Sequence, residues 1–248
     1  MAEYKKAASL IAESKAAVAL TGAGISAESG IPTFRGPGGL WERYDWRKLA
    51  TREAFQQNPR LVWEWYAMRI RLVQEAKPNP AHVALAKLEE MGLLKAVITQ
   101  NVDGLHRRAG SKNVIELHGS ITRARCTSCS RTYRVTAPPQ EIPPRCSCGA
   151  LLRPDVVWFG EPLPRDQLEE AVNLASEADL IIVVGTSLLV QPAASLPFIT
   201  IQRGGKAIEV NPETTPLTPY AAVSIREKAA QALPRIVSEV EQLAAGAP

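Results

Sequence analysis

A glycine-rich turn near the N-terminus is the first segment whose residue types suggest a chemical role. It runs from Thr21 to Arg35 and directly follows a short apolar stretch, 16–20. Gly22 and Gly24 allow the backbone to approach a pyrophosphate closely, and the residues after them can start a helix whose N-terminus favours negative charge. A G-x-G turn is a weak signal by itself, because tight turns after strands often need glycine for steric reasons. The turn therefore predicts a nucleotide site that other segments must complete.

Four later apolar stretches end in small or polar residues, as the walls of a ligand cleft require. These ends are Gln100–Asp103 after 95–99, His118 after 114–117, Gly185–Ser187 after 180–184, and Asn211–Pro212 after 207–210. Strand-to-helix turns commonly contain the same residue types, so each end alone is ambiguous. Together they predict a cleft, because ligands of parallel sheets bind beyond the carboxyl ends of the strands.

The order of these stretches along the chain indicates the fold class. Apolar runs such as Leu180–Val184, with a last one at 222–225, alternate with stretches of helical spacing, which are 4–14, 82–91, 167–178, 192–203 and 227–243. Near-continuous apolar strands that alternate with helices are typical of a parallel sheet covered on both faces. We therefore expect an α/β fold with a Rossmann-like parallel sheet.

Two segments interrupt this alternation. Residues 36–80 are rich in tryptophan, arginine and helix-forming residues, and residues 123–154 hold all four cysteines. We expect the two insertions to pack together as a smaller domain, one helical and the other zinc-binding. The larger, nucleotide-binding domain would then consist of residues 1–35, 81–122 and 155–248.

Composition sets broad limits on the class of protein. With 46% hydrophobic and 22% charged residues, the 248-residue chain can bury a sizeable core. Its net charge of +4 and pI near 8.9 would suit a nucleic-acid-associated partner, but many ordinary enzymes share them, and we expect no direct nucleic-acid binding. No apolar run approaches transmembrane length, and charges break up the N-terminus, so we expect a cytoplasmic protein without a membrane partner.

The four cysteines form two closely spaced pairs, Cys126 with Cys129 and Cys146 with Cys148. Such pairs on two turns can supply four thiolates to one tetrahedral zinc ion, and a closed site of four thiolates is structural. The second pair is one residue shorter than the usual C-x-x-C, although Gly149 can help the turn. Disulfides are the alternative, but the clustering and a reducing compartment favour zinc.

Taken together, the motifs resemble those of the sirtuin family. The strings GAGISAESGIPTFRG, TQNVDGLH, ELHGS, VVWFGE and GTSL and the Asn211 turn have the order and spacing found in sirtuins, over about 16–225. The resemblance implies a NAD-dependent protein-lysine deacylase that transfers the acyl group to ADP-ribose and releases nicotinamide. NAD would be its co-substrate, one zinc ion its structural metal and acyl-lysine proteins its partners, and DNA-associated substrates would suit the basic charge.

The resemblance also implies which residues hold NAD. They are Gly22, Ala23, Gly24, Ile25, Glu28, Pro32, Thr33, Phe34, Arg35, Trp41, Gln100, Asn101, Val102, Asp103, Gly185, Thr186, Ser187, Asn211, Pro212, Glu213 and Ala229. Phe34 and Arg35 would line the pyrophosphate and the nicotinamide ribose. Asn101 would hold that ribose and Asp103 the carboxamide.

His118 matches the position of the general base in this family. A base is needed because a ribose hydroxyl must be activated before it takes over the acyl group, and imidazole titrates near neutral pH. The alternative is a histidine that only satisfies a turn at a strand end. The segment whose backbone would pair with an extended acyl-lysine peptide consists of Val157, Trp158, Phe159, Gly160 and Glu161.

Tyr66 and Arg69 stand three residues apart in a helical stretch, so they share one helix face. A phenol and a guanidinium that converge can bind a carboxylate, which arginine holds through two hydrogen bonds. The spacing matches the Y-x-x-R motif of the sirtuin branch that removes succinyl and malonyl groups, and Ala50 would leave space for the longer chain. The alternative is an arginine that extends to solvent beside an amphipathic tyrosine.

Two other functions fit parts of the sequence. A dehydrogenase would also bind NAD, but position 27 is alanine where the G-x-G-x-x-G motif has its third glycine. In a nucleic-acid-binding module the arginines near the cysteines would contact phosphates, although such arginines more often face solvent. Formation of NADH would indicate the first alternative, whereas NAD cleavage that does not need His118 would contradict the enzyme hypothesis.

Overall fold

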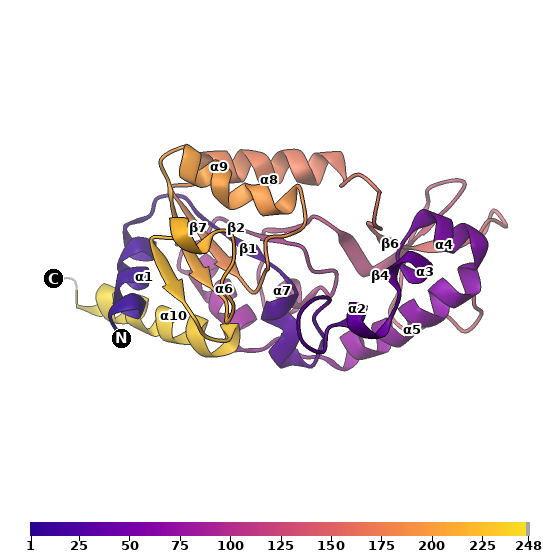
Figure 1. The fold of residues 1–248 in the computed structure, drawn as a ribbon, viewed down its shortest axis with the longest axis horizontal. Helices are drawn as coiled ribbons and strands as arrows, with labels where there is room; N and C mark the ends of the chain where they lie inside the picture. The colour runs from indigo at the N-terminus through magenta and orange to yellow at the C-terminus, as the bar shows by residue number, and fades with distance from the viewer. Residues whose placement is uncertain (247–248) are drawn as a thin grey trace.

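The computed structural model describes residues 1–246, and its larger sheet consists of six parallel strands (Figure 1). These strands are β1 (Ala17–Thr21), β2 (Ala96–Thr99), β3 (Val114–Glu116), β7 (Leu180–Val184), β8 (Lys206–Val210) and β9 (Val223–Ile225). Their order across the sheet is β3-β2-β1-β7-β8-β9, so the strand order reverses between β1 and β7. Rossmann-like sheets bind ligands at this switch point. The predicted fold class is confirmed.

Helices cover both faces of this sheet (Figure 1). On one face lie α1 (Ala2–Glu13), α6 (Pro80–Glu90) and α10 (Ala229–Ala245), and on the other lie α8 (Arg165–Glu177) and α9 (Leu196–Gln202). Successive side chains of β1 face opposite cores, with Ala19 packed against the first group and Leu20 against the second. Because both faces are covered, the strands are mostly apolar, and β7 is apolar at every position.

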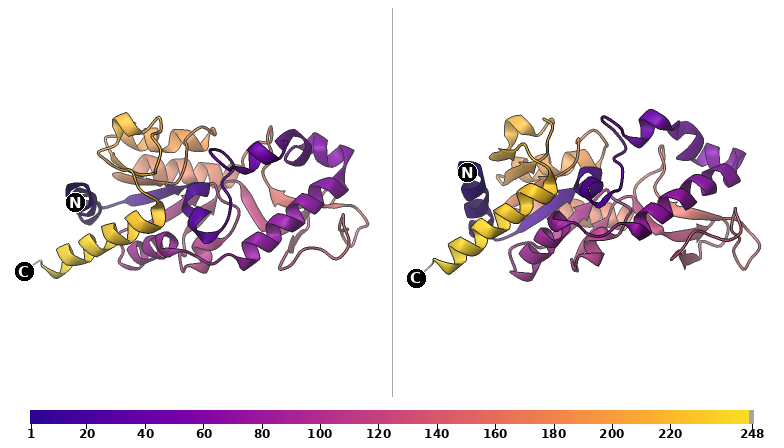
Figure 2. Two further views of the ribbon diagram at one scale, coloured as in Figure 1. Left: turned by 60° about the horizontal axis from the view of Figure 1, so that its bottom comes forward. Right: turned by 90° about the horizontal axis from the view of Figure 1, so that it is seen from below.

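A second group of elements, which we call the small module, lies at one end of the large sheet (Figure 1). It contains α2 (Leu40–Arg43), α3 (Trp46–Leu49), α4 (Arg52–Gln57), α5 (Pro59–Glu75) and an antiparallel sheet of β4 (Gly119–Cys126), β5 (Thr132–Arg134) and β6 (Leu152–Val156). Apolar side chains from 40–73 and 121–158 share one core, in which Trp63 is fully buried. The N-terminus and the end of α10 lie at the opposite end of the molecule (Figure 2).

Two predicted helices differ from the structure. Residues 192–203 form a short 3-10 helix, Ala193–Ser195 (η2), followed by α9, which begins only at Leu196. Pro197 has no backbone N–H to donate, and it stands in the first turn of α9, where the helix needs no such donor. The helix after the glycine turn is also of the 3-10 type, Ala23–Ser29 (η1).

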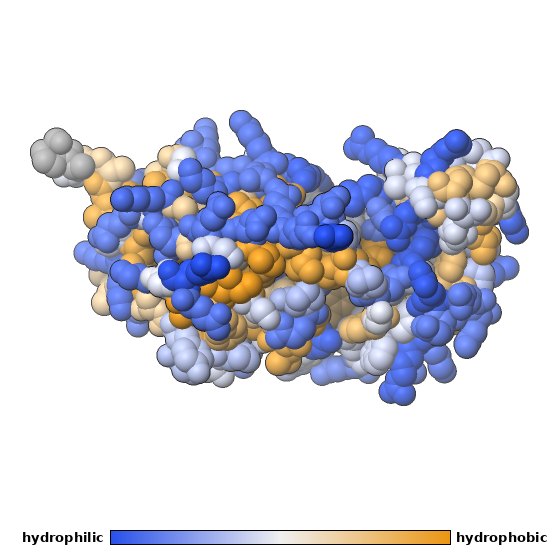
Figure 3. Space-filling view, turned by 90° about the horizontal axis from the view of Figure 1, so that it is seen from above, coloured by the Kyte–Doolittle hydropathy of each residue, from blue (hydrophilic) through white to orange (hydrophobic). Residues whose placement is uncertain are grey.

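The surface is mostly hydrophilic. On the face shown in Figure 3, an apolar strip crosses the middle of the molecule between hydrophilic residues. No helix within residues 1–246 is long and apolar enough to cross a bilayer.

Candidate functional site

Two glycine turns meet where the sheet reverses its strand order. The Gly24 N–H donates to the carbonyl of Gly185, which follows β7, at 2.8 Å. A Cβ on Gly22 would lie 2.7 Å from the Thr186 Cβ, and one on Gly24 would lie 2.8 Å from the Gly185 Cα. Gly185 itself has a φ of +60°, which side chains rarely tolerate. Glycine is therefore required here because the two backbones touch, so the steric explanation of the turn applies whether or not a phosphate binds.

A cavity of about 870 Å³ opens at this switch point and reaches the small module. The predicted NAD-binding residues on its wall are Gly22, Ala23, Gly24, Glu28, Thr33, Phe34, Arg35, Trp41, Gln100, Asn101, Val102, Gly185, Thr186, Ser187, Asn211, Pro212, Glu213 and Ala229. The predicted catalytic and substrate-binding residues on the same wall are His118, Tyr66, Arg69 and 157–161. Ile25, Pro32 and Asp103 do not line it, and Ile25 is fully buried in the core.

Asp103 lies behind the cavity wall in a buried hydrogen-bond network. Its carboxylate accepts hydrogen bonds from the Ser26 hydroxyl at 2.7 Å and the Leu105 N–H at 2.9 Å. Asn101 donates from Nδ2 to the Gly22 carbonyl at 3.0 Å and to the Ser26 hydroxyl at 3.2 Å. Burial raises the pKa of Asp103, although these hydrogen bonds to its carboxylate oppose the shift. The network fixes Asn101 relative to the glycine turn.

Two buried histidines extend this network beneath the glycine turn. His82 Nε2 lies 3.3 Å from the Ser26 hydroxyl, and His106 Nε2 lies 2.8 Å from the Thr21 hydroxyl. The two rings are 4.9 Å apart. Burial lowers the pKa of His82 to about 4 and that of His106 to about 3, and the charge of His82 adds to the second shift. Both rings are therefore neutral at pH 7.

These pKa values predict that the protein loses stability in mild acid. The unfolded chain takes up protons on both histidines below about pH 6.5, whereas the folded chain resists protonation down to about pH 4. The histidines should therefore leave the free energy of unfolding unchanged above pH 7 and lower it between about pH 6.5 and 4, by on the order of 3 kcal/mol each. Chemical denaturation at several pH values measures this, and His82→Gln should weaken the dependence. A pH-independent free energy over this range would contradict the prediction.

His118 stands just beyond β3, where its Nδ1 lies 3.0 Å from the Gln100 carbonyl oxygen. A carbonyl can only accept, so Nδ1 carries the hydrogen and Nε2 of the neutral ring keeps a free lone pair. Burial lowers the pKa of His118, and the hydrogen bond to Gln100 partly offsets the shift. A neutral imidazole with a fixed tautomer on the cavity wall is suited to accept a proton.

Glu209 and Arg226, which belong to no recognised motif, hold the loop after β8. The buried Glu209 carboxylate forms an ion pair with Arg226 and accepts a hydrogen bond from the Thr218 hydroxyl at 2.8 Å. Arg226 also donates to the carbonyls of Asn211 at 3.0 Å and Glu213 at 2.7 Å. This side chain therefore fixes the backbone at two predicted NAD-binding positions. The one hint in the sequence is a carboxylate inside an otherwise apolar stretch.

The segment after β6 forms a second wall of the cavity. The N–H groups of Val157, Trp158, Phe159 and Glu161 all donate within the protein, at distances between 2.9 and 3.0 Å. Gly160 is different, because its N–H has no acceptor within residues 1–246. A peptide strand that pairs with this segment must therefore bond to the carbonyl groups of the segment or to the Gly160 N–H.

Arg69 lies beside Tyr66 on α5 and is only 8% exposed. Its guanidinium carbon is 4.9, 4.8 and 5.4 Å from the ring centres of Phe34, Trp65 and Tyr66. Burial lowers the pKa of Arg69, while Tyr66 and the charge of Asp103 oppose the shift. No ion pair within residues 1–246 includes Arg69. The alternative of an arginine extended to solvent is therefore wrong, and the cavity contains a buried cation without a counter-ion.

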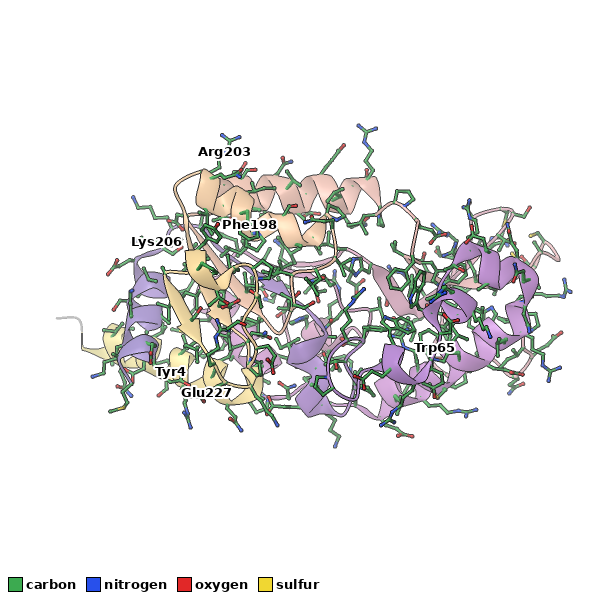
Figure 4. All side chains as sticks on the ribbon, in the orientation of Figure 1. Tyr4, Trp65, Phe198, Arg203, Lys206 and Glu227 are labelled. Atoms are coloured by element: carbon green, nitrogen blue, oxygen red, sulfur yellow. The ribbon has the colours of Figure 1, made fainter. Side chains whose placement is uncertain are left out.

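Trp65 is a cavity residue that no motif indicated. It lies on α5 in the small module (Figure 4), and its ring stacks on that of Trp41 at 5.5 Å. Its Nε1 is buried without a hydrogen-bond partner among the described residues. Nothing in the sequence marks Trp65 as a cavity residue, because tryptophans in a helix commonly belong to a core.

Comparison with known proteins decides the family. A model described as the Sir2 family matches residues 22–192. The chain belongs to the Sir2 family. Among relatives, the NAD-dependent protein deacylase 1 of Archaeoglobus fulgidus is 58% identical over 234 residues, which cover 94% of this chain and 96% of that protein. The NAD-dependent protein deacylase 2 of Pyrobaculum aerophilum is 56% identical over 236 residues, which cover 95% of both.

Solved Sir2 structures share the fold of this chain. A mutant Sir2 homologue in complex with ADP-ribose is 55% identical, with a TM-score of 0.96 over 98% of both chains. A Sir2 homologue in complex with NAD is 57% identical, with a TM-score of 0.91 over 96% of this chain and 94% of that chain. A mutant Sir2 protein with a deacetylated p53 peptide and 3'-O-acetyl-ADP-ribose is 44% identical, with a TM-score of 0.89 over 95% of this chain and 97% of that chain.

The four cysteines of this Sir2 protein are free thiols whose Sγ atoms all lie within 4.8 Å of one another. Cys126 and Cys148 have their sulfurs 3.5 Å apart, and Cys129 and Cys146 have theirs 3.7 Å apart. A tetrahedral zinc ion with Zn–S bonds of about 2.3 Å holds its sulfurs about 3.8 Å apart. Gly149, with a φ of +86°, forms the tight turn that the short second pair needs. The cluster fits zinc, and none of its cysteines lines the cavity.

Removal of zinc should destabilise this Sir2 protein without directly altering its cavity. A strong chelator is expected to lower the melting temperature by about 10 °C or more, because a structural zinc ion contributes several kcal/mol to folding. Differential scanning fluorimetry and metal analysis by mass spectrometry test this together, and added zinc should restore the original melting curve. A zinc-free protein with an unchanged melting temperature would contradict the structural role.

Proposed function

We propose that this chain is a NAD-dependent protein-lysine deacylase that acts on acyl-lysine side chains of proteins. The observation that carries the proposal is the single cavity lined by the glycine turns, His118 and the segment 157–161. A dinucleotide at the strand ends and an acyl-lysine beside that segment would both reach His118. The relatives' names support the proposal, since the two described above are NAD-dependent protein deacylases.

Separate groups of residues bind NAD and transfer the proton. The glycine turns and the strand-end residues bind NAD, and Arg226 holds the loop that carries Asn211 and Glu213. NAD, when bound, supplies the ribose carbon that receives the acyl oxygen and the nicotinamide that leaves. His118 accepts the proton of a ribose hydroxyl at Nε2, while Gln100 keeps the ring in the required tautomer.

The domain division proposed from the sequence would place this site between two domains. Residues 1–35, 81–122 and 155–248 would form the nucleotide-binding domain, and residues 36–80 and 123–154 the smaller one. Cavity walls from both parts, such as Gly185 and Arg69, support this division. The acyl-lysine would then bind between the domains, and DNA-associated proteins are substrates that the net charge of +4 would suit.

We further propose that the site accepts acyl groups that end in a carboxylate, such as succinyl and malonyl. The support is Arg69, a cation that is 8% exposed, enclosed by aromatic rings and without an ion pair in residues 1–246. A buried charge is costly unless a partner compensates it. A carboxylate at the end of an acyl chain would be that partner. Ala50 lines the same cavity, and its small side chain would leave space for the longer acyl chain.

Mass spectrometry of the products tests the activity. The protein is incubated with NAD and a panel of peptides that carry acetyl, malonyl or succinyl groups on the same lysine. We expect peptide with an unmodified lysine, nicotinamide and O-acyl-ADP-ribose in equal amounts. Production of NADH would instead indicate a dehydrogenase, and NAD bound without turnover would indicate a binding module.

A further inference from the structure

We propose that Trp158 is a positioning residue that directs the Tyr66 hydroxyl toward an acyl carboxylate and so sets acyl selectivity. This inference rests on the anionic acyl site proposed above. The Trp158 indole Nε1–H donates to the Tyr66 hydroxyl oxygen at 3.0 Å. The two side chains are 3% and 2% exposed, and they come from two separate segments that line the cavity, one after β6 and one on α5.

This hydrogen bond restricts the direction in which the Tyr66 hydroxyl can donate its own hydrogen. Its oxygen accepts from Trp158 on one side, so its own hydrogen must point elsewhere. No acceptor takes that hydrogen within residues 1–246, and a buried donor without an acceptor is unfavourable. A carboxylate beside Arg69 would accept it, whereas the methyl end of an acetyl group would not. Trp158 therefore favours succinyl and malonyl groups over acetyl through Tyr66.

A second set of contacts holds the Trp158 ring in place. The Arg153 guanidinium stacks on the ring, 3.6 Å from its centre, and donates to both carboxylate oxygens of Glu161 at 2.6 and 2.8 Å. The Trp158 backbone N–H donates to the same carboxylate at 3.0 Å. Burial would raise the pKa of Glu161, but the hydrogen bonds from Arg153 and Trp158 lower it. The carboxylate stays ionised at neutral pH, and the contacts restrict Nε1 to one direction.

The test compares kcat/KM for a succinylated and an acetylated form of one peptide, with the zinc-loaded 248-residue chain. Trp158→Phe keeps an aromatic ring but removes the N–H. We expect the ratio of succinyl to acetyl kcat/KM to fall about three- to tenfold, as for the loss of one directing hydrogen bond. The Kd of the succinylated peptide without NAD should rise by a similar factor.

Trp63→Phe is the matched control. Trp63 is also fully buried in the small module, and its Nε1–H also donates, to the Leu152 carbonyl at 2.7 Å, but it does not line the cavity. This variant should lower the melting temperature and leave the acyl ratio unchanged. If both variants lowered the two activities by equal factors, Trp158 would have only a structural role and the inference would be wrong.

A double-mutant cycle shows whether Trp158 acts through Tyr66. In a Tyr66→Phe background, Trp158→Phe should change the acyl ratio no further, because the hydroxyl that it directs is absent. Additive effects on the ratio would overturn the inference. Should Trp158→Phe not fold, Arg153→Lys, which removes the stacked guanidinium plane and keeps the charge, should lower the ratio in the same direction. A normal ratio in these variants together with a lowered ratio in Arg69→Met would reject this inference and leave the anionic acyl site intact.

Discussion

Replacement of His118 by alanine is expected to lower kcat for deacylation by about two to four orders of magnitude. The reason is that His118 is placed to act as the general base, with Nδ1 fixed by the Gln100 carbonyl 3.0 Å away and Nε2 free. General bases contribute on the order of 10²- to 10⁴-fold to enzymatic rates. Steady-state rates of O-acyl-ADP-ribose formation from NAD and an acylated peptide measure the loss. The Kd of NAD should change little, since the variant keeps the predicted NAD-binding side chains.

The pH profile provides a second measurement on the same group. Burial lowers the pKa of His118, so its neutral form persists to a lower pH than that of an ordinary histidine. In the wild type, kcat/KM should therefore rise with pH along an acidic limb whose midpoint lies below about 6.5 and stay level above it. His118→Ala should lose this limb. Full product formation by the variant would exclude His118 as the base, and an acidic limb centred above pH 7 would contradict the geometry around Gln100.

The sequence predicted the large sheet well because its strands are buried on both faces. A strand such as Leu180–Val184 is apolar at every position, so it could be recognised without a partner, and the parallel topology followed from the helices between the strands. The bounds of one predicted helix differ from the structure, because apolar periodicity carries no information on the type of helix. At 192–203 a 3-10 helix precedes α9, and Pro197 stands in the first turn of α9, whereas periodicity alone predicted one continuous helix.

The candidate site was predictable wherever a residue follows a strand directly, and less so where side chains meet through space. His118 and the glycine turns belong to the first kind, since strand ends converge on one edge of the sheet. Arg226 belongs to the second, because its ion pair with Glu209 joins β8 to a residue beyond β9. The position of Asp103 behind the wall also depends on the fold, because its partner Ser26 lies 77 residues away. The spacing of residues along the chain does not predict contacts between side chains so far apart in sequence.

Arg69→Met is expected to lower kcat/KM for a succinylated peptide by about a hundredfold and that for the acetylated peptide by a factor of about three or less. Methionine fills similar apolar space among Phe34, Trp65 and Tyr66 but offers no charge to the acyl carboxylate. The loss should appear mainly in KM, because a carboxylate held by Arg69 would be bound equally in the ground state and the transition state. The measurement compares the two acyl forms of one peptide at saturating NAD.

Arg71→Met is the matched control for this variant, because Arg71 lies two residues further along α5 but is exposed and does not line the cavity. Removing its charge should leave both activities unchanged, whereas a general effect of net charge on peptide binding would lower them in both variants. Equal losses on the two peptides in Arg69→Met would mean that the guanidinium supports the cavity wall and does not recognise the acyl group. A buried cation enclosed by three aromatic rings would then need another anion as its partner, and because Phe34 is both one of those rings and a predicted NAD-binding residue, a matching rise in the KM for NAD would identify NAD as that partner.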